Sequence, residues 1–331
     1  MRWLSVGGVR VPRVSSTFSN HDRLGAWKAR WGINRMNYLV PAGLYAVGEP
    51  GPDAPVIVTA NYKMTYDLVR RELAGRSVWL LVLETFGINV WCAAGKGTFG
   101  TDELVRRIGK SALLKVVSHR RLILPILGGP GVSAHEVKRR TGFSIAYATL
   151  RASDLPEYLD NGEVTTAAMR QLTFNWYERL VLIPVEMVLV LKPVSLVGAA
   201  VYLAALLLGG GSAAATALGA YLGAVCTGIA VAPLLLPVLP GKSFAVKGAF
   251  AGLAFSAALF GLAGGAGWSL PVTLASFLAL PAVSAFYTLN FTGCTTYTSR
   301  SGVRKEMRLG IPVMGSALVA ALVLVLAGRL F

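Results

Sequence analysis

Apolar residues are unevenly distributed along this chain, and their distribution limits the folds open to it. Up to about residue 180 they alternate with polar and charged residues, whereas long stretches beyond that point carry almost no charge. The mean hydropathy of +0.57 is too high for an ordinary soluble protein. About 20 consecutive apolar residues suffice to cross a bilayer. The sequence therefore predicts a soluble N-terminal domain followed by a membrane domain.

Five segments of the second half are long and apolar enough to be spans. The loops at 209–212 and 264–269 are uncharged, whereas those at 240–243 and 295–308 are basic. Because basic loops stay on the cytoplasmic side, this alternation predicts a multi-pass protein of the cytoplasmic membrane, with a cytoplasmic N-terminal domain and an external C-terminus. The predicted spans are 192–208, 213–239, 244–264, 270–291 and 311–330.

The spans contain no Asp, Glu or His in their interiors, which favours an anchor or docking platform over a conduction path. The stretch 179–191 is apolar but contains Pro184 and Glu186. It is predicted to be an interfacial or linking helix, with an extension of the first span as the alternative.

The distribution of charge and the cysteine content argue against a nucleic-acid partner and against a disulfide-stabilised fold. The net charge of +16 permits nucleic acid as a partner, but many basic residues lie near predicted membrane ends, and no basic stripe is interleaved with aromatic residues. Membrane lipid is therefore the expected partner, and nucleic acid is not. The N-terminus lacks the apolar run of a signal peptide. The three cysteines lie far apart, so no disulfide framework is expected.

The first half alternates strand-like and helix-like segments. Predicted strands at 56–62, 77–85, 121–127 and 143–149 alternate with predicted helices at 64–73, 101–115 and 133–142, a pattern typical of a Rossmann-like parallel α/β sheet. Ligands of such sheets bind outside the carboxyl ends of the strands. The predicted organisation is a loosely structured arm of unassigned role (1–50), the α/β domain (51–165), a linker (166–191) and the membrane domain (192–331).

The stretch "NVWCAAGKGTF" (89–99) follows the second predicted strand and holds a single cysteine. As a short helix over 89–96, it would place Asn89, Cys92, Ala93 and Lys96 on one face. A thiolate is a soft metal donor, and Lys96 and the helix N-terminus would favour the ionised form. One thiolate without a second protein ligand suggests a metal already held by a macrocycle. The alternative is a buried cysteine that acts as a small hydrophobe.

Two phosphate-binding patterns compete for the same stretch. The P-loop pattern fails on both sides of Gly95-Lys96. The dinucleotide pattern G-x-G-x-x-G is present as Gly95, Gly97 and Gly100. However, the preceding strand ends about ten residues too early, and basic residues stand where an acidic one should follow. A membrane protein with a nucleotide-binding cytoplasmic domain remains an alternative.

The stretch 89–99 also resembles the cap-helix signature of the mercury-methylating corrinoid protein family. That family is related to the large subunit of the corrinoid iron–sulfur protein of the acetyl-CoA pathway. A second block, "NFTGCTTYTSRSGVRKEM" (290–307), resembles the family's loop before the last membrane helix. The resemblance implies a cobamide-binding α/β domain followed by five transmembrane helices, in anaerobic one-carbon metabolism.

The resemblance implies that Cys92 is the lower axial ligand of cobalt in a bound cobamide and is required for catalysis. The surrounding helix would contact the cofactor through Asn89, Val90, Trp91, Ala93, Ala94, Gly95 and Lys96. Further contacts are expected from position at the strand ends alone, at Thr59, Asn61, Thr65, Gly128, Gly129, Gly131 and Tyr147. The common cobalamin fingerprint D-x-H-x-x-G is absent around all three histidines.

The implied activity is a cobamide-dependent methyltransferase that gives methylmercury. Hg(II) is an electrophile, so it must receive methyl as a carbanion equivalent or a radical, and a thiolate ligand on cobalt would favour that transfer. The implied partners are Hg(II), a small ferredoxin with two [4Fe–4S] clusters and a methyl donor derived from a methylated folate. The basic residues 300–308 could dock the ferredoxin or only fix topology, and Cys294 could relay mercury or be inert. A methyl carrier of one-carbon metabolism that never meets mercury is a further alternative.

Overall fold

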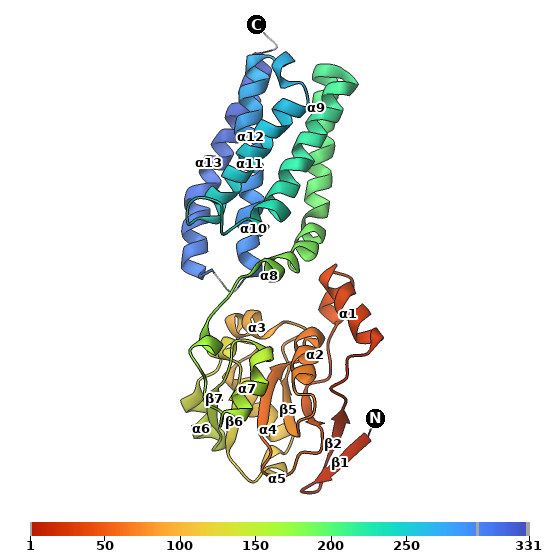
Figure 1. Ribbon diagram of the computed structural model, residues 1–331, viewed down its shortest axis with the longest axis vertical. Coiled ribbons are helices and arrows are strands. Elements are labelled where there is room, and N and C mark those ends of the chain that lie inside the picture. The colour runs from red at the N-terminus through yellow and green to blue at the C-terminus, as the bar shows by residue number, and fades with distance from the viewer. Residues whose placement is uncertain (1, 296–297, 329–331) are drawn as a thin grey trace. The chain divides into compact units, whose positions relative to one another are not determined.

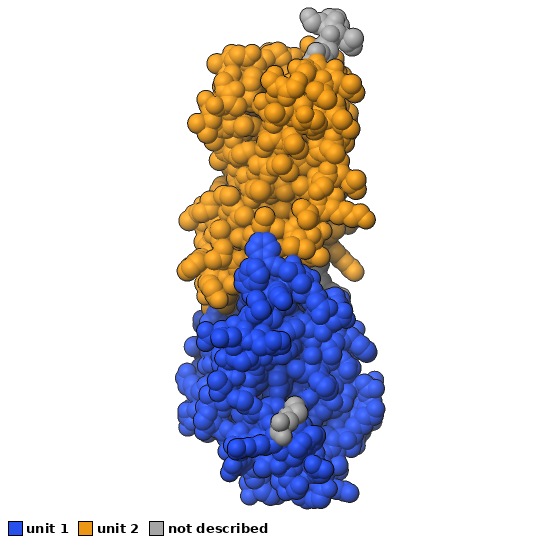
Figure 2. Space-filling view, turned by 90° about the vertical axis from the view of Figure 1, so that its right-hand side faces the viewer, with its two compact units in different colours: residues 1–172 blue, residues 173–331 orange. Residues whose placement is uncertain are grey.

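The computed structural model describes residues 2–295 and 298–328, which divide into two compact units, residues 1–172 and 173–331 (Figure 2). We call them the α/β unit and the helical unit. The division falls inside the predicted linker 166–191, between the predicted end of the α/β domain at residue 165 and the change to apolar sequence at about residue 180.

The α/β unit is built on a seven-stranded sheet with the order β1-β2-β3-β5-β4-β6-β7 (Figure 1). The four strands predicted from the sequence are parallel to one another, and each pairs within this sheet. The bounds of these strands are β4 (Val56–Ala60), β5 (Val78–Leu83), β6 (Arg121–Leu124) and β7 (Ser144–Tyr147).

Three further strands come from the N-terminal fifty residues, where a loosely structured arm was expected. β1 (Arg2–Val6) and β2 (Val9–Val14) form an antiparallel hairpin, and β2 runs parallel to β3 (Gly43–Val47). β3 in turn pairs antiparallel with β5. The sheet is therefore mixed rather than wholly parallel, and the N-terminal segment is part of it.

Between β2 and β3 lie the helix α1 (Asn20–Arg30) and the short helix η1 (Arg35–Asn37). Buried charges fasten α1 to α2 (Lys63–Glu72). Lys63 Nζ lies 2.6 Å from carboxylate oxygens of both Asp22 and Asp67, and Arg70 lies 2.8 Å from both acids. We call these four residues the arm ion cluster. Although burial alone would raise it, the pKa of Asp22 is held far below its usual range by hydrogen bonds from Lys63, Ser19 and Arg70.

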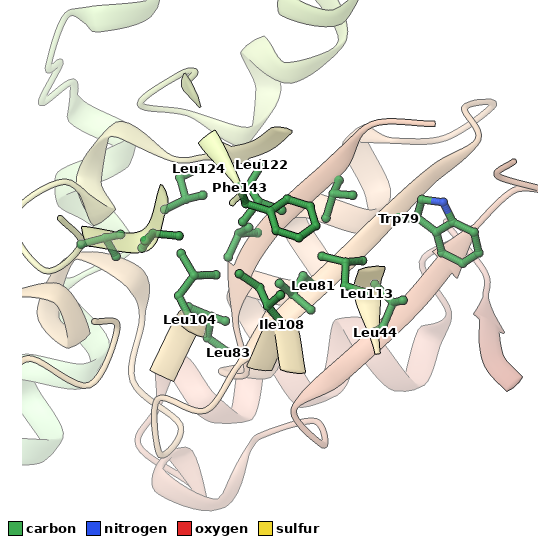
Figure 3. Packing of buried hydrophobic residues seen from close by; sticks show 14 of the residues in the cluster. Leu44, Trp79, Leu81, Leu83, Leu104, Ile108, Leu113, Leu122, Leu124 and Phe143 are labelled. Atoms are coloured by element: carbon green, nitrogen blue, oxygen red, sulfur yellow. The ribbon is translucent and has the colours of Figure 1, made fainter. Parts of the chain in front are cut away.

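Helices cover both faces of the sheet because each strand alternates its side chains between two apolar clusters. One cluster packs against the helices α3 (Val90–Lys96), α4 (Thr101–Lys110), α5 (Leu113–Val116) and α6 (Ala134–Thr141). Figure 3 shows its centre, where Leu81 and Leu83 of β5 face Leu104 and Ile108 of α4. The other cluster packs beneath α2, α7 (Leu155–Asp160) and the short helix η4 (Ala168–Arg170). The short helices η2 (Ile126–Gly128) and η3 (Ala152–Asp154) complete the connections.

The helical unit consists of long apolar helices and short helices between them (Figure 1). In chain order they are α8 (Trp176–Leu180), α9 (Ile183–Cys226), the π-helix η5 (Thr227–Val231), α10 (Ala232–Leu234), α11 (Phe244–Leu262), η6 (Gly265–Gly267), α12 (Leu270–Asn290), η7 (Phe291–Cys294) and α13 (Arg300–Ala327). Within the described residues, four segments are long and apolar enough to cross a membrane: Trp176–Leu234, Phe244–Leu262, Leu270–Gly293 and Ser301–Ala327.

The prediction of five separate spans is confirmed only in part. The first two predicted spans fall in one 59-residue helical segment, which is interrupted at Gly210, where φ is +77°. Residues from Ile183 onward belong to α9. This agrees with the alternative interpretation of 179–191, in which the stretch extends the first predicted span. α13 begins eleven residues before the predicted span 311–330, whose last two residues lie outside the described part. The side chains of Cys294 and Arg300 also lie outside it.

Small residues allow α11 and α12 to pack closely. A Cβ atom at Gly248 would lie 2.5 Å from Thr288 Oγ1, and one at Gly252 would lie 2.6 Å from Pro281 Cα. Close approach through small residues is typical of helices that associate in lipid. At one end of the unit, Glu306 of α13 accepts hydrogen bonds from Ser243 (2.9 Å) and the N–H of Ala245 (3.3 Å), which caps α11. This contact explains why α13 extends into the segment predicted to be a loop.

Candidate functional site

The chain order of the parallel strands marks one place at the sheet edge for a ligand. From β4 the chain passes to β5 on one side and then crosses to β6 on the other, so the strand order reverses between β4 and β6. Open α/β sheets bind ligands at such a switch point, outside the carboxyl ends of the strands. The helix α3 stands in the β5–β6 crossover and packs against η2, which directly follows β6. The predicted cap helix therefore lies at the switch point.

Local chemistry explains why α3 forms where it does. Asn89 is its N-cap, and its side-chain oxygen accepts a hydrogen bond of 2.9 Å from the N–H of Cys92. Gly97 ends the helix in the left-handed conformation with φ of +83°. The helix predicted over 89–96 is thus confirmed.

The two faces of α3 differ in burial. Val90, Ala93 and Ala94 are buried against the sheet. The other face carries the partly exposed Trp91 and Cys92 and the exposed Gly95 and Lys96. The prediction that Ala93 shares the face of Cys92 is therefore wrong, because the helix turns both alanines towards the core. A Cβ atom at Gly95 or Gly97 would meet no atom within 4 Å, so the surface beside Cys92 is open.

The thiol of Cys92 is protonated in the structure, whereas the ionised form was expected from the sequence. Burial raises the pKa of its thiol, and the opposing effects of Lys96, Arg35 and the Asn89 hydrogen bond do not cancel it. The thiol is thus protonated at neutral pH, whereas the sequence had suggested that nearby positive charge would ionise it. A metal at this position would have to displace the proton.

A titration of Cys92 tests this balance. We expect alkylation of the cofactor-free protein by iodoacetamide, followed at Cys92 by mass spectrometry, to give a midpoint above that of an ordinary thiol. Lys96→Gln should raise the midpoint further, and Arg35→Gln should raise it by less, because each removes a cation that favours the thiolate. Arg139→Gln, which changes an exposed arginine paired with Glu136, is the control and should leave the midpoint unchanged. A lower midpoint in either of the first two variants would contradict the assignment.

Asn61, predicted as a cofactor contact, holds the loop that leads to α3. It is fully buried, and its Oδ1 accepts from Thr85 N (3.0 Å), Thr85 Oγ1 (2.9 Å) and Gly87 N (3.3 Å). Its Nδ2 donates to Glu84 over 2.5 Å. The loop also contains Phe86, which is 63% exposed and has a positive φ of 55°. A bulky residue in this conformation is uncommon and is held here by the surrounding hydrogen bonds.

The other predicted strand-end residues take different places. Thr59 is buried in β4, and its hydroxyl has no partner among the described residues. Thr65 lies partly exposed on α2. Tyr147, at the end of β7, donates a hydrogen bond of 2.7 Å to the carbonyl of Val132 and so ties down the loop after η2. The ring of Tyr147 lies 3.8 Å from where a Cβ atom of Gly129 would stand.

The glycines after β6 allow the close approach of α3. A Cβ atom at Gly131 would lie 2.1 Å from the carbonyl oxygen of Phe99 and 2.9 Å from Ala94 Cα, and one at Gly128 would lie 2.6 Å from the Phe99 ring. These glycines therefore position the cap helix through packing. Gly129 is less constrained, with its nearest neighbour at 3.1 Å.

Gly131→Ala tests this packing. Because the nearest atoms are backbone atoms, the added methyl group must displace α3 or the 97–100 loop, and we expect a loss of about 1–3 kcal/mol in the free energy of unfolding of the α/β unit. Urea denaturation of the full chain in detergent would measure it. Gly109→Ala in α4 is the matched control, since its methyl group meets nothing within 4 Å and should stabilise slightly. Equal midpoints for the two variants would rule out the close packing.

The geometry argues against the dinucleotide alternative. The N–H of Thr101, at the start of α4, donates to the carbonyl of Gly131 (3.2 Å), and the first turn carries Asp102 and Glu103. A helix N-terminus that binds pyrophosphate needs free N–H groups and no negative charge. The Gly95–Gly100 pattern serves the turn between α3 and α4 instead.

The donor set fits a metal that arrives with its own macrocycle. Across residues 2–295 and 298–328, no group of three His, Cys, Asp or Glu side chains could hold a metal ion. Cys92 presents one sulfur on the open face of α3, next to two glycines that leave room for a broad, flat ligand. One soft donor beside an open surface would suit a metal that brings its other ligands with it.

The sequence did not point to the role of the segment before β3. The carbonyl oxygen of Met36 lies 2.7 Å from where a Cβ atom of Gly87 would stand, and Leu39 pairs with Tyr62 next to β4. Arg35 stacks 5.5 Å over the Tyr62 ring and favours the thiolate of Cys92. More than fifty residues separate Arg35 from Cys92, so no local pattern could have joined them.

Comparison with known proteins places this unit among known relatives. Residues 35–157 match the family described as CO dehydrogenase/acetyl-CoA synthase delta subunit. The acetyl-CoA decarbonylase/synthase complex subunit gamma of Methanopyrus kandleri is 32% identical over 123 residues, which are 37% of this chain and 26% of that protein. The Archaeoglobus fulgidus subunit is 30% identical over 128 residues (38% and 27%), and subunit gamma 2 of Methanosarcina thermophila is 37% identical over 95 residues (28% and 20%).

These similarities confirm the coarser prediction, a relationship to proteins of acetyl-CoA synthesis. The chain spans about a quarter of the length of these relatives. The family match runs from η1 to α7, so it includes α3 and the whole switch point. α1, the β1–β2 hairpin and the helical unit lie outside it.

Proposed function

We propose that this chain binds a cobamide at the switch point of its α/β unit and transfers a methyl group from it to Hg(II). The observation that carries the proposal is the position of Cys92, a single accessible sulfur on the open face of the cap helix. The motif around it resembles that of the mercury-methylating corrinoid proteins, and the similarity to acetyl-CoA decarbonylase/synthase subunits supports a one-carbon role.

The residues of α3 have distinct tasks in this proposal. Cys92 would be the axial ligand, and uptake of the cobamide would release its proton, since the thiol is protonated in the free protein. Lys96 and Arg35 would stabilise the resulting thiolate. Asn89 holds the N–H of Cys92 and thereby fixes the orientation of the helix turn that presents the sulfur.

The cobamide would supply a methyl group bound to cobalt. The thiolate of Cys92 would be an electron-rich donor to that metal, and it would favour transfer of the methyl group to electrophilic Hg(II). Hg(II) is the substrate here and needs no permanent protein ligand.

The helical unit supplies the membrane part of the proposal. Its helices expose large apolar side chains, such as Leu207 at 87% and Leu262 at 90%, which suits lipid better than water. We propose that they span the cytoplasmic membrane, with the α/β unit in the cytoplasm. A ferredoxin with two [4Fe–4S] clusters would supply electrons, and a methylated folate would be the source of methyl.

Methyl transfer by the purified chain tests the proposal. The full chain in nanodiscs, loaded with methylcobalamin, should convert Hg(II) to methylmercury, which is quantified by mass spectrometry. The names of the relatives favour a second candidate, a methyl carrier for acetyl-CoA synthesis. Methyl transfer to a thiol acceptor without any transfer to Hg(II) would support that candidate and contradict the first.

A further inference from the structure

The face of α1 that points away from the sheet is apolar and exposed. Leu24 and Trp27 are 51% and 57% exposed, Trp31 directly after the helix is 36% exposed, and the two indole rings lie 6.1 Å apart. These positions follow the spacing i, i+3, i+7, which places them along one stripe of the helix. Ile33 and Met36 extend the exposed apolar surface to 54% and 61% exposed side chains. We call this surface the α1 ridge.

The opposite face of α1 is fixed to the rest of the α/β unit. Asp22 and Ala29 are buried, and Gly25 lies so close to Tyr38 that a Cβ atom would stand 2.4 Å from its hydroxyl oxygen. Asp22 is held by the arm ion cluster and also closes the capping box with Ser19. The helix therefore cannot roll to bury the α1 ridge without breaking buried ion pairs.

The charges around the α1 ridge are of one sign. Residues 20–39 contain four basic residues and one acidic residue, Asp22, which is buried and paired. Arg23 and Lys28 are exposed beside the apolar stripe. A fixed helix with Trp and Leu on one face and flanking Arg and Lys is typical of segments that lie in the interface of an anionic bilayer.

We infer that the α1 ridge binds the surface of an anionic lipid bilayer. The inference rests on the proposal that the helical unit spans a membrane, because that unit begins at Thr173, directly after the α/β unit, and so keeps a bilayer within reach. The ridge would then be a second attachment of the α/β unit to lipid, besides its covalent link. It would restrict the orientations of the switch point relative to the membrane surface.

Fluorescence quenching by brominated lipid tests the inference. The full chain is placed in nanodiscs of phosphatidylglycerol and phosphatidylcholine with brominated acyl chains, and its tryptophan emission is compared with that in unbrominated discs. We expect Trp27→Tyr/Trp31→Tyr to lose a quenched component that the wild type has. Trp3→Tyr, which removes an indole of similar exposure (51%) from β1, should lose only unquenched emission.

Charge reversal supplies the second measurement. Arg23→Glu/Lys28→Glu should reduce quenching of the Trp27–Trp31 pair in anionic discs, and pure phosphatidylcholine discs should do the same for the wild type. Trp268→Tyr supplies the reference for the helical unit, because Trp268 lies next to α12. Loss of a quenched component in this variant shows that the unit is inserted. If Trp268 is quenched but the α1 pair is not, or if only an acidic ferredoxin shields the pair, the lipid assignment is overturned while membrane insertion stands.

Discussion

Replacement of Cys92 by alanine is expected to abolish methylmercury formation. The variant loses the thiol proposed to bind cobalt. The rate in the nanodisc assay should therefore fall by at least about a hundredfold, the upper end of the loss seen when only a supporting contact to a metal site is removed. The anaerobic absorption spectrum of the cobamide-loaded protein should change as well, because the sulfur proposed to bind cobalt would be absent. The spectrum and the rate together separate loss of the ligand from loss of the cofactor.

Cys226→Ala is the matched control for this experiment. Cys226 is exposed in the helical unit and should be dispensable. Because Cys92 is only partly buried on an outward face, its loss leaves no large cavity, and circular dichroism should report a folded protein. Full activity in Cys92→Ala would falsify the proposed role of the thiolate.

Asp67→Ala is expected to destabilise the α/β unit by about 3–5 kcal/mol, the usual effect of removing one partner from a buried ion pair. The side chain of Asp67 is 1% exposed and accepts from both Lys63 (2.6 Å) and Arg70 (2.8 Å). Its removal leaves two cations that share Asp22 alone. Urea denaturation of the full chain in detergent would give the change.

Glu72→Ala on the same helix is the control, because Glu72 pairs with the exposed Arg71 and such pairs contribute at most about 1 kcal/mol. The pH dependence of the free energy of unfolding should also show the contribution of the arm ion cluster. The pKa of Asp22 is lowered in the folded protein, so its contribution is fully present above the ordinary carboxyl value of about 4 and is lost as the pH falls below it. Similar losses in the Asp67 and Glu72 variants would mean that the arm ion cluster adds little stability.

Much of the α/β unit could be predicted because its strands are continuous apolar runs. β4 and β5 are buried at every position, so "VIVTA" and "VWLLVL" are recognisable without their partners. β1 and β2 were missed because "RWLSV" and "VRVPRV" mix arginine and proline with apolar residues, as strands near an edge do. Their pairing with β3 depends on contacts between segments distant in sequence.

The helix that carries the proposed site was predicted in its position, and its packing was predicted less well. The spacing of 89–99 was sufficient to predict a helix at the strand ends, with Cys92 accessible. It was not sufficient to tell which face of the helix meets the core. Ala93 and Gly95 are both small, and only the packing of the folded unit buries Ala93 and leaves Gly95 open. The raised pKa of the thiol likewise results from burial by the surrounding fold, which local charge counting omits.

The ion pairs that hold α1 determine where a stable fragment of the protein can begin. A fragment that starts at residue 35, where similarity to the relatives begins, would lack Asp22 and the β1–β2 hairpin. Lys63 and Arg70 would then keep only Asp67, and the outer edge of β3 would lie bare and open to pairing with a second molecule. A soluble fragment intended for crystals or spectroscopy should therefore start at the very beginning of the chain and extend to residue 172.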